Sequence, residues 1–424
     1  MLKYFLPDWE DRLDPYFNFD KDEYSAEHNR APYQTDVYAH QMFSKLPYDG
    51  ILLSLSIFQS KLALKNGINY KYTIRGHTNI KDYLKIPSNS KIEVMGDCGA
   101  FGYVKEIEPP EPFYNVKNIA FLYESLGFDY GVSVDHLVVD YVMVRNNVTG
   151  KKIKKEFTKL EKDNRIKITL ENARKFLELH KKNNYHYIPI GVAQGYDLNT
   201  YKKSVKSLIK MGYSYIGIGG LVQYNSDFIL DVLKEINPYI SNVKLHLFGV
   251  LRPNYLKEFE NLGVTSFDSA SYLRKAWLRS GQNYLAPNGK WYAAIRVPQS
   301  SNVNLIKNGN INGYSKRDIL KMEKAALTAL INYDKGTSTI EEVLDVVIKY
   351  DNLLLRTSEN LNEIKKRYIR TLEDKPWKSC KCDICKKIGI HVIIFRGCNR
   401  NKRRGFHNTW NFREIAKTNG IFKD

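Results

Sequence analysis

Residues 187–220 read YIPIGVAQGYDLNTYKKSVKSLIKMGYSYIGIGG, and this stretch decides the fold. Its two ends, Tyr187–Gln194 and Tyr215–Gly220, are apolar runs of the length of a strand. Runs that are apolar almost throughout are typical of strands buried on both faces of a parallel sheet. Between them, Leu198–Met211 carries apolar residues at helical spacing. The stretch therefore predicts one strand–helix–strand unit of an α/β protein.

Similar units recur on both sides of this stretch. Seven strand-like runs in sequence order, most of them separated by helical patterns, favour a (β/α)8 TIM-like barrel over a doubly wound sheet. The eighth strand of such a barrel has no clear signal in the sequence. The five further apolar runs are Gly50–Ser54, Ile92–Asp97, Tyr130–Asp135, Lys244–Val250 and Val264–Asp268.

The barrel is expected to span residues 48–314, after an N-terminal extension of residues 1–47. Within it, residues 145–185 are lysine-rich and are interpreted as a basic insertion. Residues 315–424 are predicted to be helical and to end in a cysteine-rich, basic C-terminal subdomain. The helices expected there are Ser315–Tyr333, Ser338–Tyr350 and Leu353–Thr371.

Charge and composition narrow the class of function. The chain carries 65 Lys+Arg against 46 Asp+Glu, a net charge of +19, which favours a polyanionic partner and nucleic acid first. Its hydrophobic content of 43% excludes disorder as the main state. No apolar run reaches the roughly 18 residues of a membrane span. The N-terminus has no signal-peptide pattern, so a cytoplasmic protein is expected.

Three of the five cysteines crowd into one short segment with the spacing C-x-C-x-x-C, which indicates a metal site rather than disulfides. Three thiolates and one imidazole make a closed tetrahedral set typical of structural zinc. Such an ion would hold the tail of the chain, expected to be rich in loops, in its folded form. The candidate ligands are Cys380, Cys382, Cys385 and His407, with His391 and Cys398 as alternatives for the fourth position.

Polar residues fall repeatedly at the carboxyl ends of the candidate strands. That face is where barrel enzymes gather their catalytic groups. Aspartates that form turns or cap helices could explain one or two of these positions. A buried strand, however, has no reason to end repeatedly in an acid. The residues concerned are Asp97, Asp135, Gln194, Gly219, Gly220 and Asp268.

Together these motifs resemble the tRNA-guanine transglycosylase family, in family order from about residue 48 to residue 415. The pair His407-Asn408 after the cysteine motif is similar to the end of that family's zinc subdomain, which favours His407 as the fourth ligand. The other segments that carry the resemblance are GDCGAFGYV (96–104), GVSVD (131–135), GVAQG (191–195), IGIGGL (216–221) and SFDSASYLRKAW (266–277).

The resemblance implies a base exchange with Asp268 as the nucleophile and Asp97 as the general acid/base. Exchange with retained configuration is achieved by double displacement through a covalent aspartyl-glycosyl intermediate. Asp135 would accept hydrogen bonds from N1 and N2 of guanine, while Gln194 and nearby backbone N–H groups would donate to O6. The base-binding residues implied are Asp135, Gln194, Gly219, Gly220 and Leu221, with Phe101 and Tyr103 stacking on the base.

The basic segments are expected to hold a nucleic-acid backbone around this pocket. The target base has to leave its stack to reach the pocket, which costs a few kcal/mol in a duplex. A charge run is as often only a solvated face. The candidate contacts are Lys151, Lys152, Lys154, Lys155, Arg274, Arg400, Lys402, Arg403 and Arg404.

Departures from the family pattern point to its DNA-modifying branch. Ala100 and Gly102 replace a glycine and a glutamine of the first motif, and no Pro-Thr-Arg follows Asp268. The sequence Asp-Ser-Ala-Ser-Tyr from Asp268 is more similar to the archaeal enzymes and to the DNA-modifying branch, while the archaeal C-terminal RNA-binding domains are not expected. The resemblance therefore implies a DNA-guanine transglycosylase that inserts 7-cyano-7-deazaguanine. It also implies an ATPase or helicase-like partner that opens DNA.

Two alternatives stay open. A tRNA-guanine transglycosylase that makes a queuosine- or archaeosine-type modification would share the same pocket residues. A non-catalytic nucleic-acid-binding subunit on the same fold is the other alternative. The presence of both Asp97 and Asp268 argues against it, because a subunit without chemistry has little need for either.

Overall fold

The computed structural model describes residues 2–59, 62–65, 71–145, 151–279, 281–301, 313–353 and 360–422. The chain divides into two compact units, which are described separately below. The barrel unit consists of Met1–Glu10, Tyr48–Ala270 and Gly420–Asp424, and the helical unit consists of Asp11–Pro47 and Ser271–Asn419.

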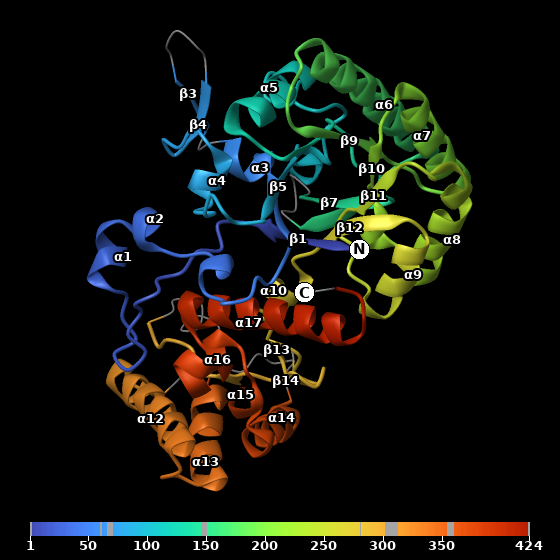
Figure 1. The fold of residues 1–424 in the computed structure, drawn as a ribbon. Coiled ribbons are helices and arrows are strands. Elements are labelled where there is room, and N and C mark those ends of the chain that lie inside the picture. The colour runs from blue at the N-terminus through green and yellow to red at the C-terminus, as the bar shows by residue number, and fades with distance from the viewer. Residues whose placement is uncertain are drawn as a thin grey trace. The chain divides into compact units, whose positions relative to one another are not determined.

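The barrel unit is built on a closed ring of parallel strands in the order β1-β12-β11-β10-β9-β6-β5-β2 (Figure 1). This ring confirms the predicted (β/α)8 barrel. Every strand inferred from an apolar run is present, with ends that agree to within a few residues. The barrel strands are β1 (Lys3–Asp8), β2 (Gly50–Ser54), β5 (Glu93–Asp97), β6 (Tyr130–Val132), β9 (Ile188–Ala193), β10 (Tyr215–Ile218), β11 (Lys244–Leu247) and β12 (Val264–Asp268).

Strand β1 is the strand for which the sequence has no clear signal. Its residues KYFLPD pair in parallel with β2 on one side and with β12 on the other. Lys3, Pro7 and the acidic residues that follow hide the strand in the sequence, because they break the continuous apolar run of the others. The expected extension 1–47 is therefore wrong: its first residues close the barrel, and residues 11–47 belong to the helical unit.

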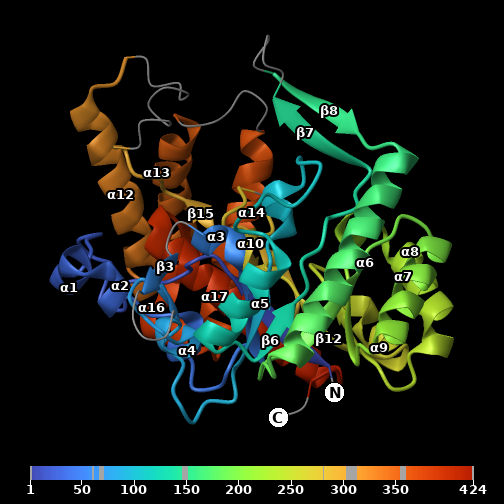
Figure 2. The same ribbon diagram turned by 90° about the horizontal axis from the view of Figure 1, so that it is seen from above.

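Helices follow the strands and cover the outside of the ring (Figures 1 and 2). A representative one, α7, begins after Asp197, whose side chain accepts a hydrogen bond from the Thr200 N–H at 2.7 Å. It ends at Gly212, whose φ of 101° is left-handed. The main helices of this unit are α3 (Leu55–Phe58), α4 (Ile80–Tyr83), α5 (Val116–Leu126), α6 (Lys159–Lys182), α7 (Leu198–Met211), α8 (Ser226–Ile236) and α9 (Leu256–Asn261).

Only part of the basic segment 145–185 is an insertion. The antiparallel hairpin β7 (Tyr141–Arg145) and β8 (Lys152–Glu156) is inserted between β6 and α6 (Figure 2). Helix α6 itself packs against β9 and between α5 and α7, so it is the barrel's own helix. It looks like an insertion in the sequence because it buries a single stripe and exposes the remaining, mostly charged positions.

The interior of the barrel is filled with large side chains, as in other packed barrels. Phe5 and Tyr215 belong to this core and are at most 4% exposed. Because the core is solid and mostly apolar, most of the polar residues singled out in the sequence lie at the ends of the strands, and the buried His246 and Ser266 are polar residues within strands. The complete core cluster is Phe5, Leu52, Met95, Tyr130, Val132, Ile190, Val192 and Tyr215.

The helical unit contains helices in the three predicted ranges and, among those not predicted, one long helix. The predicted helix Leu353–Thr371 lies partly outside the described residues, which resume at residue 360. The tail after the cysteine motif was expected to be rich in loops, but it forms the long helix α17. No helix in the described part of the chain has the length and apolarity to cross a membrane. The larger elements are α10 (Ser271–Lys275), β13 (Tyr284–Leu285), α12 (Lys316–Lys335), α13 (Ile340–Asn352), α14 (Leu361–Asp374), α15 (Pro376–Ser379), α16 (Asp383–Ile388) and α17 (Gly397–Thr418).

Candidate active site and metal centre

The polar residues singled out in the sequence lie at one edge of the barrel. Asp97 and Asp268 are the last residues of β5 and β12. Gln194 and Gly219 directly follow β9 and β10, and Asp135 lies just beyond β6. Because the strands are parallel, these carboxyl ends share one face of the barrel.

Asp97 and Asp135 form a close pair of carboxyl groups. One oxygen of each lies within 4.8 Å of the other and of the Cys98 sulfur. The Gly99 N–H donates to Asp97 Oδ2 at 3.1 Å. Burial, followed by the charges of Asp135 and Asp268, raises the pKa of Asp97 from its ordinary value of 3.8 to about 7. A carboxyl group with this pKa can give and take a proton near neutral pH.

Asp268 is held by two donors on one of its oxygens. The Gly249 N–H donates to Oδ1 at 2.9 Å, and His246 Nε2 lies 3.1 Å from the same atom. The other oxygen, Oδ2, has no hydrogen-bond partner among the described residues. Sequence reasoning missed both His246 and Gly249. The available signal was a polar residue inside the apolar run KLHLFGV that became β11.

Asp135 and Gln194 contact each other directly. Gln194 Nε2 donates to Asp135 Oδ2 at 2.7 Å, and the Cys98 thiol donates to Oδ1 at 3.1 Å. Gln194 Oε1 accepts the Val138 N–H at 3.2 Å, which fixes the orientation of the amide. Burial raises the pKa of Asp135. The second amide hydrogen of Gln194 and the remaining lone pairs of Asp135 are then the groups that a ligand with both donors and acceptors can engage.

The glycine-rich turn after β10 brings backbone close to this pair. A Cβ on Gly219 would lie 2.3 Å from Gln194 Nε2, so any side chain there would displace the amide. Gly220 has a φ of 74°, in the left-handed region that favours glycine. Leu221 follows, fully buried, at the start of a short 3-10 helix, Leu221–Gln223. Gly219 is therefore required by its close approach to Gln194, and Gly220 by its backbone conformation.

The two aromatic residues expected to stack on the base differ in position. Phe101 is 69% exposed. Tyr103 is 2% exposed, and its ring packs against Tyr114 and His136. Its hydroxyl donates to the Asp135 carbonyl oxygen at 2.7 Å. Stacking by Tyr103 was therefore a wrong prediction: the residue is enclosed and supports the loop that carries Asp135.

The lysines of the hairpin β7–β8 are on the surface, as nucleic-acid contacts need to be. All the residues from 151 to 156 are exposed. Lys154 pairs with Glu156 at 2.7 Å and lies over the ring of Tyr141, which is itself 49% exposed. The exposed lysines are Lys151, Lys152, Lys154 and Lys155.

The predicted basic contacts of the tail are instead internal to the helical unit. Arg400, Arg403 and Arg404 are at most 1% exposed. Arg400 pairs with Asp22, and Arg403 donates to the carbonyl oxygen of Asp14. The prediction of phosphate contacts in the tail was wrong, because helix α17 buries these guanidinium groups against main-chain carbonyls and acids. The two other predicted contacts of this unit are also engaged: Lys402 donates to the Arg12 carbonyl oxygen and Arg274 pairs with Asp11.

Replacing Arg404 with methionine is expected to destabilise the protein by about 3 kcal/mol or more. Arg404 donates to the carbonyl oxygens of Val392, Ile394 and Ala276 and to Asn401 Oδ1, and methionine leaves these acceptors buried without donors. Denaturant unfolding measures the effect. A variant with exposed Lys152→Met is the control and is expected to unfold as the wild type does, whereas equal stability of both variants would contradict the structural role.

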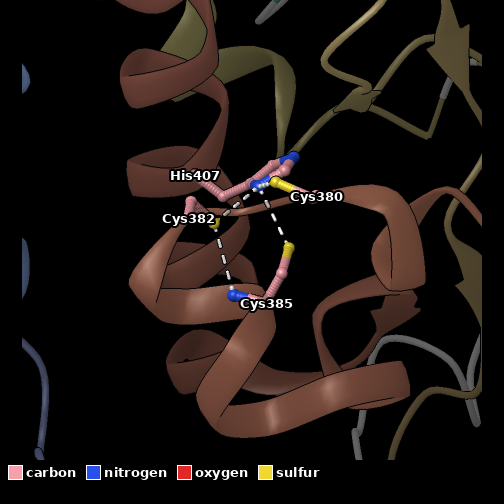
Figure 3. A group of neighbouring side chains, drawn as sticks. All are labelled: Cys380, Cys382, Cys385 and His407. Carbon is pink, nitrogen blue, oxygen red and sulfur yellow. Dashed lines mark hydrogen bonds between the residues drawn. The ribbon is translucent and has the colours of Figure 1, made fainter.

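Three cysteines and one histidine converge in the helical unit (Figure 3). Their ligand atoms all lie within 4.8 Å of one another, and all four side chains are buried. His407 Nδ1 lies 3.7, 3.3 and 3.2 Å from the sulfurs of Cys380, Cys382 and Cys385. These separations are close to the edge of about 3.5 Å expected of tetrahedral zinc with sulfur and nitrogen ligands. The cluster therefore fits a metal ion.

A second contact fixes which nitrogen of His407 faces the sulfurs. Its Nε2 donates to the Leu285 carbonyl oxygen at 2.8 Å, which leaves the Nδ1 lone pair for the ion. The two alternative ligands lie elsewhere. His391 stacks on Phe19 at 4.9 Å, and Cys398 is exposed. The structure therefore favours His407 as the fourth ligand.

The chain is similar to one protein family and to individual proteins of known activity. The family described as queuine tRNA-ribosyltransferase matches residues 134–312. A DNA-guanine transglycosylase of Salmonella montevideo is 38% identical over 418 residues, which cover 96% of this chain and 94% of that protein. A tRNA-guanine(15) transglycosylase of Methanocaldococcus jannaschii is 27% identical over 197 residues, which cover 45% of this chain and 26% of that protein.

Proposed function

This chain belongs to the tRNA-guanine transglycosylase family, within the branch of the DNA-guanine transglycosylases, and on that premise we propose that it exchanges guanine in DNA for 7-cyano-7-deazaguanine. It is a guanine transglycosylase. The choice of DNA is supported by the relative that matches nearly the whole chain, because the tRNA-acting relative matches less than half of it. The base exchange is supported by one observation above all, a carboxyl group of pKa about 7 on the same barrel edge as Asp268.

We propose a double displacement in which the two aspartates have separate tasks. Asp268 Oδ2 attacks C1′ of the nucleotide, and Asp97 protonates the departing guanine. The incoming base then gives its proton to Asp97 and attacks C1′, which frees Asp268. Two inversions return the original configuration. The contrasting surroundings of the two carboxyl groups support this division, since Asp97 is close to another acid and Asp268 is held by donors.

The pocket is proposed to read the edge that guanine and 7-deazaguanines share. Asp135 accepts from N1–H and N2–H, which other bases match less well. Gln194 uses its second amide hydrogen for O6, aided by backbone N–H groups of Gly220 and Leu221. Phe101 stacks on the base, and the hairpin lysines, Lys151, Lys152, Lys154 and Lys155, contact phosphates. Both bases fit because they differ at position 7 and not along this edge.

Zinc is proposed as the ion of the Cys380, Cys382, Cys385 and His407 cluster. Its chemistry there is structural, because four protein ligands leave no open position for substrate. None of the five cysteines, all of which the structure describes, is in a disulfide, which supports a reducing, cytoplasmic location. An ATPase or helicase-like partner is also proposed, because a base in a duplex must be unstacked and the chain has no Gly-x4-Gly-Lys-Ser/Thr loop of its own.

The test compares DNA and tRNA as acceptors. Wild-type protein with its cellular partners is given labelled 7-cyano-7-deazaguanine, and the nucleosides of total DNA and total tRNA are then analysed. Label is expected in DNA and absent with Asp268→Ala. Label in tRNA alone would instead establish the second candidate, a tRNA-guanine transglycosylase, which the match to the archaeal tRNA enzyme supports.

Formation of the covalent adduct is expected to slow above pH 7. Asp97 has to be protonated to donate to the leaving guanine, and its pKa is about 7. The rate of a single turnover should therefore fall about tenfold per pH unit above that value. In Asp97→Asn the rate should drop by about 10² to 10⁴ and lose this pH dependence.

The stability of the folded Asp97→Asn variant is the control for this prediction. Because the folded pKa of Asp97 is raised, the folded protein binds its proton more tightly than the unfolded chain does. The contribution of this proton to the free energy of unfolding is fully present below about pH 4 and is lost as the pH rises towards 7. Asp97→Asn should therefore be at least as stable as the wild type at pH 8. A less stable variant would show that its loss of activity is a folding defect.

A further inference from the structure

His246 is a buried residue to which the proposed exchange has so far assigned no task. It is 0% exposed and lies on β11. Its Nε2 is 3.1 Å from Asp268 Oδ1, and its Nδ1 is 2.6 Å from Ser266 Oγ. A carboxylate oxygen can only accept, so the proton of the first contact is on Nε2. His246 is therefore a donor to the carboxylate of Asp268.

The imidazole ring is held in this orientation from several sides. Ser266 Oγ also lies 2.5 Å from the Tyr215 hydroxyl. The Ser266 hydroxyl can donate to Nδ1 while it accepts from the Tyr215 hydroxyl, which leaves the Nε2 proton for Asp268. Phe248 and Phe5 pack edge-on against the ring, with centroids at 4.6 and 6.0 Å. A histidine whose only role was to fill space in the core would not need these polar contacts.

We propose that His246 is a positioning residue that promotes release of the sugar from Asp268, the second half of the exchange. This inference rests on the proposed function. In the first half, the bond from C1′ to guanine N9 breaks, the C1′–Oδ2 bond forms and Asp97 gives its proton to guanine. In the second half, the C1′–Oδ2 bond breaks and its electrons return to the carboxylate. N9 of the incoming base bonds to C1′, and its proton passes to Asp97.

The direction of the effect follows from the charge on Oδ1. In the covalent intermediate Oδ1 is an ester carbonyl oxygen, and during release it regains the charge of a carboxylate. The donors on Oδ1, His246 Nε2–H and Gly249 N–H, are aimed at this developing charge and lower the barrier to release. Before attack the carboxylate is already charged, so the same donors stabilise the ground state and do not accelerate formation.

Two matched variants test the inference. His246→Phe fills the space between Phe5 and Phe248 without a donor, whereas His246→Gln keeps an N–H for Oδ1. Adduct formation is measured in single turnovers with guanine-containing single-stranded DNA, and adduct decay is measured after addition of 7-cyano-7-deazaguanine. In His246→Phe, decay is expected to slow about 100-fold and formation to change less than about tenfold, so the adduct accumulates. His246→Gln should stay within about tenfold of the wild type in both steps.

Three outcomes would overturn the inference. Equal slowing of formation and decay would assign His246 a general structural role, and unchanged decay in His246→Phe would assign it none. Slow decay in His246→Gln would show that the donor is not the feature that matters. If His246→Phe does not fold, Ser266→Ala replaces it, with a smaller slowing of decay expected. Absence of any adduct in the wild type would instead refute the proposed covalent mechanism itself.

Discussion

Asp268→Asn is expected to abolish base exchange and the covalent protein–DNA adduct, with a loss of about 10⁴-fold or more. Asparagine has nearly the same shape, and its side-chain oxygen can still accept from Gly249 and His246 at the position of Oδ1. The nitrogen in place of Oδ2, however, has no charge and a poor lone pair for attack on C1′. Labelled guanine-containing DNA that stays with the protein on a denaturing gel measures the adduct.

An exposed aspartate supplies the matched control. Asp231 lies on the surface of α8, so Asp231→Asn makes the same chemical change away from the pocket and should retain full exchange. Thermal unfolding of both variants verifies that they are folded. If the adduct persisted in Asp268→Asn and disappeared in Asp97→Asn, the two aspartates would have exchanged roles.

Removal of the proposed zinc ion is expected to destabilise the helical unit by several kcal/mol, which corresponds to a fall of about 10 °C or more in Tm. The ligand groups of the cluster lie within 4.8 Å of one another in the interior. Without an ion, three thiols and an imidazole nitrogen would face one another in the interior. The hydrogen bonds that sulfur makes there, such as those with Tyr284 and Asn411, are weak and do not replace metal–ligand bonds. Elemental analysis should find one zinc per chain, and chelation or Cys385→Ser should remove it.

Cys398 is the control for this prediction, because it is an exposed cysteine in the first turn of α17. Cys398→Ser is expected to keep both the zinc and the Tm of the wild type. Equal loss of stability in the two serine variants would contradict a metal site at Cys385, and so would a wild-type protein without bound metal.

Because several arginines of the tail are buried, only part of the net charge of +19 is available for binding nucleic acid. The tail was the most obvious basic segment of the sequence, yet Arg400, Arg403 and Arg404 face the inside of the helical unit. Arginine can do this because its fork of N–H donors matches main-chain carbonyls and carboxylates. Binding that depends on salt is therefore expected to follow the exposed hairpin residues, such as Lys152 and Lys155, rather than the tail.

Most of the barrel could be predicted from the sequence, because a strand buried on both faces has to be apolar throughout. The apolar runs at residues 50–54 and 264–268 became β2 and β12 with the same bounds. Strand β1 could not be predicted in this way. Its pairing with β2 and β12 compensates for Lys3 and Pro7, and pairing with strands that lie far away along the chain leaves no local pattern.

The sequence by itself determined which chemical groups stand at the strand ends, namely Asp97, Asp135, Gln194 and Asp268, because the polar residue after an apolar run marks where a strand leaves the core. Only the tertiary structure decided how these groups act on one another. The pKa of Asp97 is raised by burial and then by the charges of Asp135 and Asp268, which come from other parts of the barrel. The contact of His246 with Asp268 joins two neighbouring strands, and the burial of Arg404 depends on segments more than a hundred residues away. Hydrogen bonds require heavy-atom distances of about 3 Å, and interactions between charges weaken with distance and are screened beyond roughly 10 Å. The order of residues along the chain contains no such distances.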